Sequence, residues 1–246
     1  MLNSKLLENK IALITGCNRG IGRAILKLFI EQGAKVYAVA KTQDSLIFLE
    51  NNLNCIPVYI DVTDKEQVKK LFVTIKKEQN RLDILVNNAG IMKDALIGMI
   101  SRTQIEETYS VNVFAVIDFI QYASKFFKRQ SSGSIINMAS IMGIYGNAGQ
   151  MLYSSAKGAI IALTKSASKE LAPFGIRVNA IAPGAIDTDM LHSSTGDEGI
   201  NELLKRIHAG RIGTPIEVAN TVLFLASDLS EYLTGQIIGV DGAMIV

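Results

Sequence analysis

The chain has 246 residues, of which 48% are hydrophobic, and its 25 basic and 23 acidic side chains leave a net charge of +2. This composition supports a packed core and excludes a disordered chain, and the interleaved charges lack the one-sided basic face of a nucleic-acid-binding protein. No apolar run approaches the roughly 20 residues that cross a bilayer, and two cysteines cannot form a disulfide framework. We therefore expect a cytoplasmic protein that binds neither nucleic acid nor membrane.

Short apolar segments rich in β-branched residues alternate with longer segments of helical periodicity. The strand-like segments cover residues 11–15, 35–40, 56–60, 84–86, 134–138, 177–181 and 236–240. The helical patterns cover about residues 21–32, 65–80, 104–128, 152–172, 199–208 and 216–226. Continuously apolar strands indicate burial on both faces, and strand–helix–strand repeats give a parallel sheet covered by helices. The sequence therefore predicts an α/β fold, a doubly wound Rossmann-type parallel sheet of about seven strands with helices on both faces, in a single dinucleotide-binding catalytic domain spanning residues 1–246.

A glycine-rich segment joins the first strand to the first helix and contains Gly16, Gly20 and Gly22. Gly16 would permit a tight turn, Gly20 would let the backbone approach a pyrophosphate, and Gly22 would let the helix pack on the strand. The helix N-terminus adds unpaired N–H groups and a partial positive charge. Three glycines alone also fit an ordinary turn, but their place between strand and helix favours nucleotide binding.

The spacing of these glycines, G-x-x-x-G-x-G, resembles the short-chain dehydrogenase/reductase family. The resemblance continues along nearly the whole chain, through Asp61, the segment Asn87-Asn88-Ala89-Gly90, Asn112, Ser140, Tyr153 with Lys157, Pro183, Gly184 and Thr188. Within the family, the chain looks most like the bacterial 3-oxoacyl-(acyl carrier protein) reductases. The resemblance implies an NAD(P)-dependent oxidoreductase that acts on CH–OH or C=O groups.

The resemblance also implies the residues that hold the cofactor. They are Gly16, Asn18, Arg19, Gly20, Ile21, Gly22, Lys41, Asp61, Val62, Asn88, Ala89, Gly90, Pro183, Gly184, Ile186 and Thr188. The second strand ends in Val39-Ala40-Lys41-Thr42 and lacks the acid with which NAD-preferring sites hold the ribose 2′-hydroxyl. Lys41 and Arg19 would instead attract a 2′-phosphate. We therefore expect NADP(H), with NAD(H) as the alternative and solvated surface charges as the other interpretation of the two cations.

A tyrosine and a lysine four residues apart share one face of a helix, and Tyr153 and Lys157 have this spacing. A free tyrosine has a pKa of about 10, and we expect the Lys157 ammonium and an oxidised nicotinamide to lower it. Tyr153 would then give its proton to a substrate carbonyl oxygen that Ser140 also hydrogen-bonds. By resemblance, Lys157 also holds the nicotinamide ribose, and Asn112 holds a water in a proton relay. The two histidines and two cysteines show no metal-ligand spacing, so no metal site is expected.

Residues 189–210 form a polar, glycine-bearing stretch after the sixth strand. Two interpretations remain open, a surface loop or a mobile lid that closes over the substrate. A carrier protein that delivers an acyl group is acidic and needs a basic patch. Lys125, Lys128 and Arg129 lie where the family docks its carrier, whereas Phe174 stands where a second family arginine falls.

The function we expect is an NADPH-dependent reductase of 3-oxoacyl thioesters, with acyl carrier protein as a possible partner. One alternative is an NAD(P)-dependent dehydrogenase of a free secondary alcohol or sugar. Another is a non-catalytic nucleotide-binding scaffold or a redox sensor, for which Cys17 in the glycine-rich segment is the candidate thiol and inert packing the other interpretation. The resemblance also implies a homotetramer built through the two long helices and the C-terminal strand.

Overall fold

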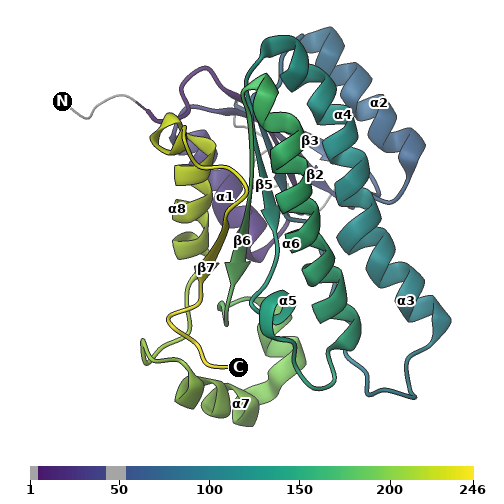
Figure 1. Cartoon of the computed structure of the whole chain (residues 1–246), viewed down its shortest axis with the longest axis vertical. Coiled ribbons are helices and arrows are strands. Elements are labelled where there is room, and N and C mark those ends of the chain that lie inside the picture. The colour runs from purple at the N-terminus through teal and green to yellow at the C-terminus, as the bar shows by residue number, and fades with distance from the viewer. Residues whose placement is uncertain (1–4, 43–53) are drawn as a thin grey trace.

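A computed structural model of the chain describes residues 5–42 and 54–246. Seven strands are present there, each within two residues of a predicted one: β1 (Ile11–Thr15), β2 (Lys35–Ala40), β3 (Cys55–Tyr59), β4 (Ile84–Asn87), β5 (Gly133–Met138), β6 (Ile176–Pro183) and β7 (Ile237–Val240). All pair in parallel, in the order β3-β2-β1-β4-β5-β6-β7. The predicted α/β fold with an open parallel sheet is therefore confirmed (Figure 1).

The strand order reverses at β1. The chain first adds β2 and β3 on one side of β1 and then places β4 on the other, so that Ile14 pairs with both Ala38 and Val86. Because every strand is parallel, all carboxyl ends lie at one edge of the sheet, the lower end of the molecule in Figure 1. Ligands of such sheets bind in the crevice outside these ends, at the point of reversal.

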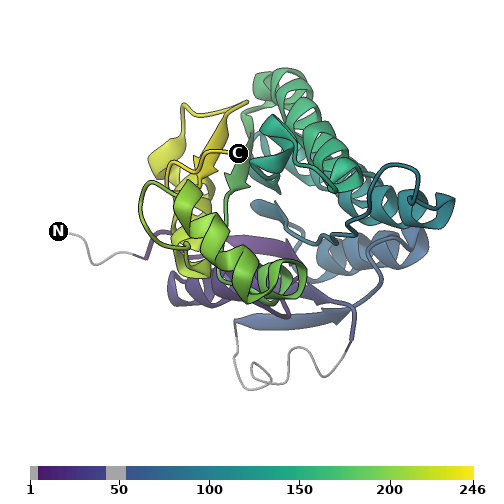
Figure 2. The same ribbon diagram turned by 90° about the horizontal axis from the view of Figure 1, so that it is seen from below.

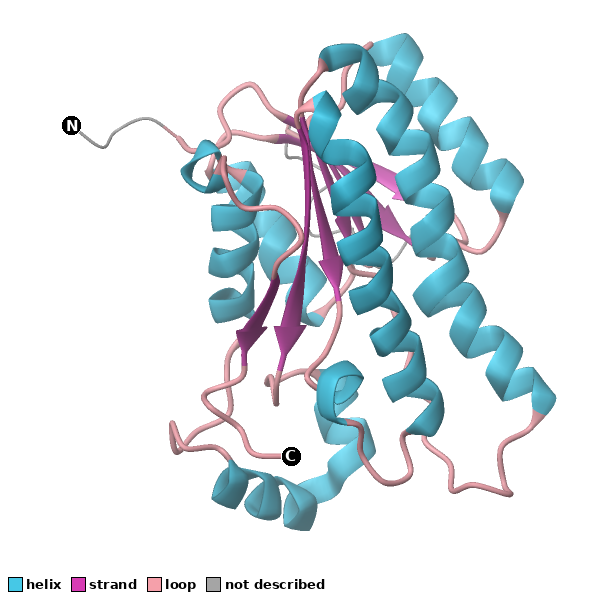
Figure 3. Cartoon of the chain, viewed as in Figure 1, coloured by secondary structure: helices cyan, strands magenta, loops and turns pink. Residues whose placement is uncertain are grey.

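Helices cover both faces of the sheet, as predicted. One face carries α1 (Gly20–Glu31) and α8 (Pro215–Ala226), and the other carries α2 (Lys65–Glu78), α4 (Ala115–Gln130) and α6 (Met151–Leu171). Phe29 and Val222 are buried on the first face, and Phe72 and Phe119 on the second. Figure 3 shows these helices on either side of the strands. No helix in the described ranges is long and apolar enough to cross a membrane.

The helix predicted over residues 104–128 is longer and interrupted. It consists of α3 (Arg102–Tyr109), a π-helical turn, η2 (Ser110–Phe114), and α4. Ser101 begins it with a capping box shared with Gln104. The π turn adds a residue to the helical repeat at Asn112, and such turns are frequent at functional sites. A short helix, α5 (Met142–Tyr145), also follows β5 where none was predicted.

Residues 189–206 are helical, which confirms the helical pattern predicted from residue 199 and shows that the interpretation of the whole stretch as a surface loop was wrong. Helix α7 (Asp189–Arg206) begins at Thr188, whose Oγ1 accepts a hydrogen bond from the Leu191 N–H at 3.4 Å. Leu191 and Leu203 pack against a small core cluster near the ends of β5 and β6. This packing outweighs the low helix propensity of the serines and glycines in the segment. Figure 2 shows α7 lying across the end of the molecule.

Candidate active site

A cavity of about 910 Å³ lies at the carboxyl ends of the strands, with α7 forming one wall. All sixteen expected cofactor residues line it, together with Ser140, Tyr153 and Lys157. Asn112 is the one predicted site residue that does not. The fold thus brings together segments that are as far apart in the sequence as Gly16 and Thr188.

The glycine-rich segment has a backbone that only glycine suits at several positions. Gly16 and Gly20 have φ of 72° and 53°, the left-handed region that side chains disfavour. A Cβ on Gly22 would lie 2.0 Å from the Gly16 carbonyl oxygen. The segment therefore wraps closely over the N-terminus of α1, and the two together form a cradle in which the first N–H groups of the helix can bind a pyrophosphate.

Asn88, which follows the neighbouring strand β4, and Thr15, the last residue of β1, hold this cradle in place. The Asn88 side-chain amide donates to the carbonyl oxygens of Thr15 and Gly16, both at 3.0 Å. Thr15 Oγ1 in turn accepts from the backbone N–H groups of Asn88 and Ala89, again at 3.0 Å. The Asn88 side-chain amide therefore binds the glycine-rich segment. The Ala89 and Gly90 backbone borders the cavity beside it.

The two cations expected to meet a 2′-phosphate each face an acid. Lys41 Nζ lies 2.8 Å from Asp61 Oδ2, and this pair lowers the pKa of Asp61 to about 2. Arg19 lies 3.6 Å from Asp189 Oδ2. Lys41 and Arg19 are largely exposed, at 77% and 62% of their side chains. Exposed ion pairs contribute at most about 1 kcal/mol, so either cation can exchange its acid for a phosphate.

The opposite wall of the cavity comes from the segment after β6. The Gly184 N–H donates to the Val240 carbonyl at 3.0 Å, which fixes this segment against β7. Thr188 faces the glycine-rich segment, because a Cβ on Gly20 would lie 3.1 Å from its Cγ2 atom. Pro183, Gly184, Ile186 and Thr188 all line this wall, and their contact with the nicotinamide carboxamide stays a prediction.

Ser140, Tyr153 and Lys157 converge at the end of β5. Lys157 Nζ lies 5.6 Å from the centroid of the Tyr153 ring, so the two side chains share a helix face as predicted. The Lys157 ammonium is 4% exposed and donates to the Met138 carbonyl oxygen at 2.7 Å. Ser140 is also buried, and its Oγ accepts from the Met142 N–H at 3.2 Å.

The surroundings of Tyr153 within the chain raise the pKa of its phenol. Burial raises it, the hydrogen-bonding interaction with the Ser140 hydroxyl lowers it, and the charge of Asp94 raises it further. The lowering expected from the Lys157 ammonium together with an oxidised nicotinamide concerns the site with its cofactor bound, and it stays a prediction. Burial also lowers the pKa of Lys157 itself, from 10.5 to about 8. Burial of Tyr153 thus favours the protonated form of its phenol, the form that can act as an acid.

Asn112 lies behind the cavity wall, in the π-helical turn. Its amide oxygen accepts from the Ile91 N–H at 2.9 Å, and its amide nitrogen donates to the Ile91 carbonyl at 2.8 Å. The side chain thus fixes the segment after β4, and a Cβ on Gly90 would meet it at 3.2 Å. A relay water held by Asn112 stays a prediction.

Comparison with known proteins agrees with this geometry. A family model described as enoyl-(acyl carrier protein) reductase matches residues 16–244. The chain belongs to the short-chain dehydrogenase/reductase family. It is accordingly an oxidoreductase that acts on CH–OH or C=O groups with a nicotinamide cofactor.

Similar members of this family carry one name. The chain is 41% identical over 245 residues to the 3-oxoacyl-[acyl-carrier-protein] reductase FabG of Thermotoga maritima, covering 98% of this chain and 99% of that one. It is 40% identical to the FabG of Chlamydia trachomatis, with the same coverage. The FabG of Vibrio harveyi is 38% identical, covering 97% and 98%.

Three polar residues of this dehydrogenase/reductase site escaped the sequence reasoning. Gln150 donates to Asp94 Oδ2 at 3.0 Å, which joins the loops after β4 and β5 at the cavity mouth. Arg206, the last residue of α7, also lines the cavity. None belongs to a motif quoted above. Only their positions, in segments that follow strands, could have pointed to them.

The remaining cysteine and histidine candidates are not placed to take part in the reaction. Cys17 is fully buried, and burial raises the pKa of its thiol far above the usual range, which makes it unreactive. His192 is exposed and pairs with Asp187 at 2.7 Å. Among the side chains that the structure describes, no three histidines, cysteines or acids gather as metal ligands would.

Proposed function

We propose that this short-chain dehydrogenase/reductase uses NADPH to reduce 3-oxoacyl thioesters, and that the acyl group arrives on an acyl carrier protein. One observation carries the proposal. The hydroxyls of Ser140 and Tyr153 meet at the wall of the cavity beside a buried Lys157, in a chain 41% identical to a 3-oxoacyl-[acyl-carrier-protein] reductase.

In this proposal the cofactor lies along the cavity from the glycine-rich segment to Tyr153. The N-terminus of α1 binds the pyrophosphate, and Arg19 and Lys41 release Asp189 and Asp61 to bind the 2′-phosphate. Lys157 and the Ala89–Gly90 backbone hold the nicotinamide ribose. The cofactor, when bound, supplies the hydride and then a positive charge near Tyr153.

The chemistry of the chain follows from the protonated state of Tyr153. Ser140 donates a hydrogen bond to the substrate carbonyl oxygen and so stabilises the negative charge that develops there. Tyr153 transfers its proton to the same oxygen. The raised pKa keeps this proton on the phenol until the oxygen becomes a strong base. The Lys157 ammonium then stands close enough to stabilise the tyrosinate.

Two other functions have less support. A dehydrogenase of free alcohols or sugars would use the same four residues, so only the substrate separates it from this proposal. A non-catalytic scaffold would not need Ser140, Tyr153 and Lys157 to converge. A redox sensor would need a reactive thiol, and burial of Cys17 opposes that.

We also propose that the chain is one catalytic domain and assembles as a homotetramer. Apolar side chains on the long-helix face and at the C-terminus support an assembly, because Phe114 is 53% and Ile245 61% exposed. Scattered exposed apolar residues are normal, so the assembly needs the direct measurement described below.

Initial rates with a panel of substrates test the proposed function. We expect NADPH oxidation with acetoacetyl-pantetheine and with acetoacetyl-(acyl carrier protein). A crotonyl thioester, which offers a C=C bond in place of the ketone, serves as the control and should not react. A higher kcat/KM for a free alcohol or sugar in the oxidative direction would contradict the proposal. So would turnover of the crotonyl thioester alone.

A further inference from the structure

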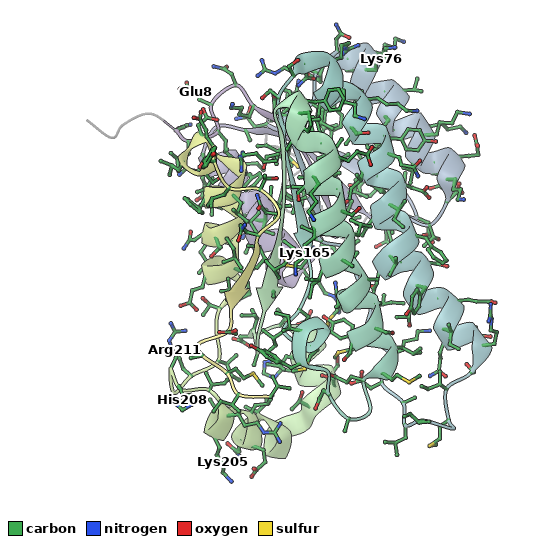
Figure 4. All side chains as sticks on the ribbon, viewed as in Figure 1. Glu8, Lys76, Lys165, Lys205, His208 and Arg211 are labelled. Carbon is green, nitrogen blue, oxygen red and sulfur yellow. The ribbon has the colours of Figure 1, made fainter. Side chains whose placement is uncertain are left out.

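One cation on the cavity wall has no part in the site described so far. Arg206 is exposed, lines the cavity, and makes no guanidinium hydrogen bond or salt bridge to any of the described side chains, which do not include those of residues 196–198. Its cationic neighbours are engaged, since Lys205 Nζ lies 2.6 Å from Glu202 and Arg211 binds both carboxylate oxygens of Glu217. Figure 4 shows Lys205, His208 and Arg211 around the end of α7. Arg206 acts on Glu202 only through its charge, without a hydrogen bond, and is therefore the most available cation among these four residues.

Arg206 is too far from the cofactor phosphates to bind them. Helix α7 starts at Asp189, which faces Arg19 beside the glycine-rich segment. Arg206 lies seventeen residues later, which at 1.5 Å per residue is roughly 25 Å along the helix. The charges at the two ends of α7 consequently serve different parts of the cavity.

The end of α7 lies instead on the catalytic side. Ile207 packs in one small cluster with Ile141, the residue after Ser140, and with Met244. The Ile245 N–H donates to the Arg206 carbonyl at 2.9 Å, which fixes the end of the helix against the C-terminal segment. Leu203 and Met244 line the cavity beside Arg206. A substrate whose carbonyl lies at Ser140 and whose chain extends toward α7 would therefore contact apolar side chains first and then a cation.

The cations expected to dock a carrier lie elsewhere. Lys128 Nζ stands 4.7 Å over the ring of Phe174, and Arg129 donates to the Asn80 carbonyl at 2.6 Å. Both belong to the C-terminal end of α4, which lies at the opposite end of the molecule from α7 (Figure 1). Within one subunit, the cation that borders the catalytic cavity on the substrate side is Arg206.

We propose that Arg206 binds the phosphate of the substrate's phosphopantetheine arm and selects phosphate-bearing thioesters. This assignment rests on the proposed function. The chemistry fits, because the arm offers an apolar and amide-bearing chain that ends in a phosphate, and a guanidinium binds phosphate oxygens in a bidentate manner. The same arm occurs in coenzyme A and on acyl carrier proteins, so the phosphate is the shared feature.

Four acetoacetyl thioesters test the assignment: those of pantetheine, 4′-phosphopantetheine, coenzyme A and acyl carrier protein. In Arg206→Gln we expect KM to rise about tenfold for the three that carry phosphate, a typical effect of losing one charged contact, and kcat/KM for the pantetheine thioester to stay within about twofold. Arg206→Lys should recover part of the loss. The matched control is Lys205→Gln, which removes the neighbouring charge and should leave all four substrates unchanged.

Any other pattern of kinetic changes across the four thioesters would overturn the assignment of Arg206 to the phosphate. Equal losses with all four substrates would indicate a structural role for Arg206, and unchanged KM values would show that no phosphate binds there. A loss confined to the carrier protein would place Arg206 against the surface of that protein instead of the phosphate. Wild-type protein that fails to reduce even the pantetheine thioester would contradict the proposed function itself, and this result requires no variant.

Discussion

Burial makes the charge of Lys157 unfavourable for folding. The folded protein holds this proton with a pKa near 8, whereas an unfolded lysine has 10.5. Between these values the unfolded chain binds more protons, so the free energy of unfolding rises with pH. Below pH 8 the full penalty is present, roughly 3 kcal/mol at about 1.4 kcal/mol per pKa unit.

Lys157→Met should therefore be more stable than the wild type at pH 7, by about 1–3 kcal/mol after loss of the bond to Met138, although inactive. Urea unfolding without cofactor at several pH values measures this. The difference should shrink as the pH rises from 8 toward 10.5. A variant less stable than the wild type over the whole range would show that burial does not disfavour this charge.

The charge of Lys41 sets the preference between cofactors. Lys41→Asp would place a carboxylate against the 2′-phosphate, so kcat/KM with NADPH should fall about tenfold or more relative to kcat/KM with NADH. Lys69→Asp on α2 makes the same charge change far from the cavity wall and is the control. An unchanged ratio in Lys41→Asp would contradict the assignment of NADP(H).

At the scale of elements, the glycine-rich segment depends on its brace from β4. Asn88→Ala removes two hydrogen bonds to the Thr15 and Gly16 carbonyls. We expect a loss of about 1–3 kcal/mol in the free energy of unfolding and weaker NADPH binding. Asn220→Ala, at an exposed position of α8, is the matched control. Urea unfolding and fluorescence titration with NADPH provide the two readouts, and wild-type cofactor affinity in Asn88→Ala would contradict the brace.

Strands and most helices were predictable from sequence because local pattern and burial agree there. The compact apolar run at residues 11–15, for example, is buried on both faces. The π turn at Asn112 was not predictable, because the spacing of apolar residues over 104–128 does not reveal one extra residue in a single helical turn. Only the second part of helix α7, from residue 199, was predictable; its first part was not, because Leu191 gains its packing partners only in the fold.

Motif residues of the site were predictable because the family spaces them regularly. The contacts around these motif residues were not predictable. The sequence could not show that Met138 takes the Lys157 ammonium, or that Asp94 raises the pKa of Tyr153, since both effects depend on contacts between separate segments. Arg206 and Gln150 escaped for the same reason.

At the scale of the whole molecule, the proposed homotetramer predicts a mass about four times the 26.7 kDa of the chain. Light scattering at micromolar concentration measures it. Phe114→Glu would place a charge at an exposed apolar position of the long-helix face and should reduce the mass to that of a smaller species. A wild-type monomer under these conditions would contradict the assembly.

Protonation of the substrate oxygen by the Tyr153 hydroxyl is the step on which the proposed function depends. The most direct test compares Tyr153→Phe with the wild type in NADPH-dependent reduction of acetoacetyl-pantetheine, with NADPH affinity measured in parallel. We predict that kcat falls at least about 100-fold while the Kd for NADPH stays within about twofold. A variant that binds NADPH normally and keeps most of its kcat would contradict the claim.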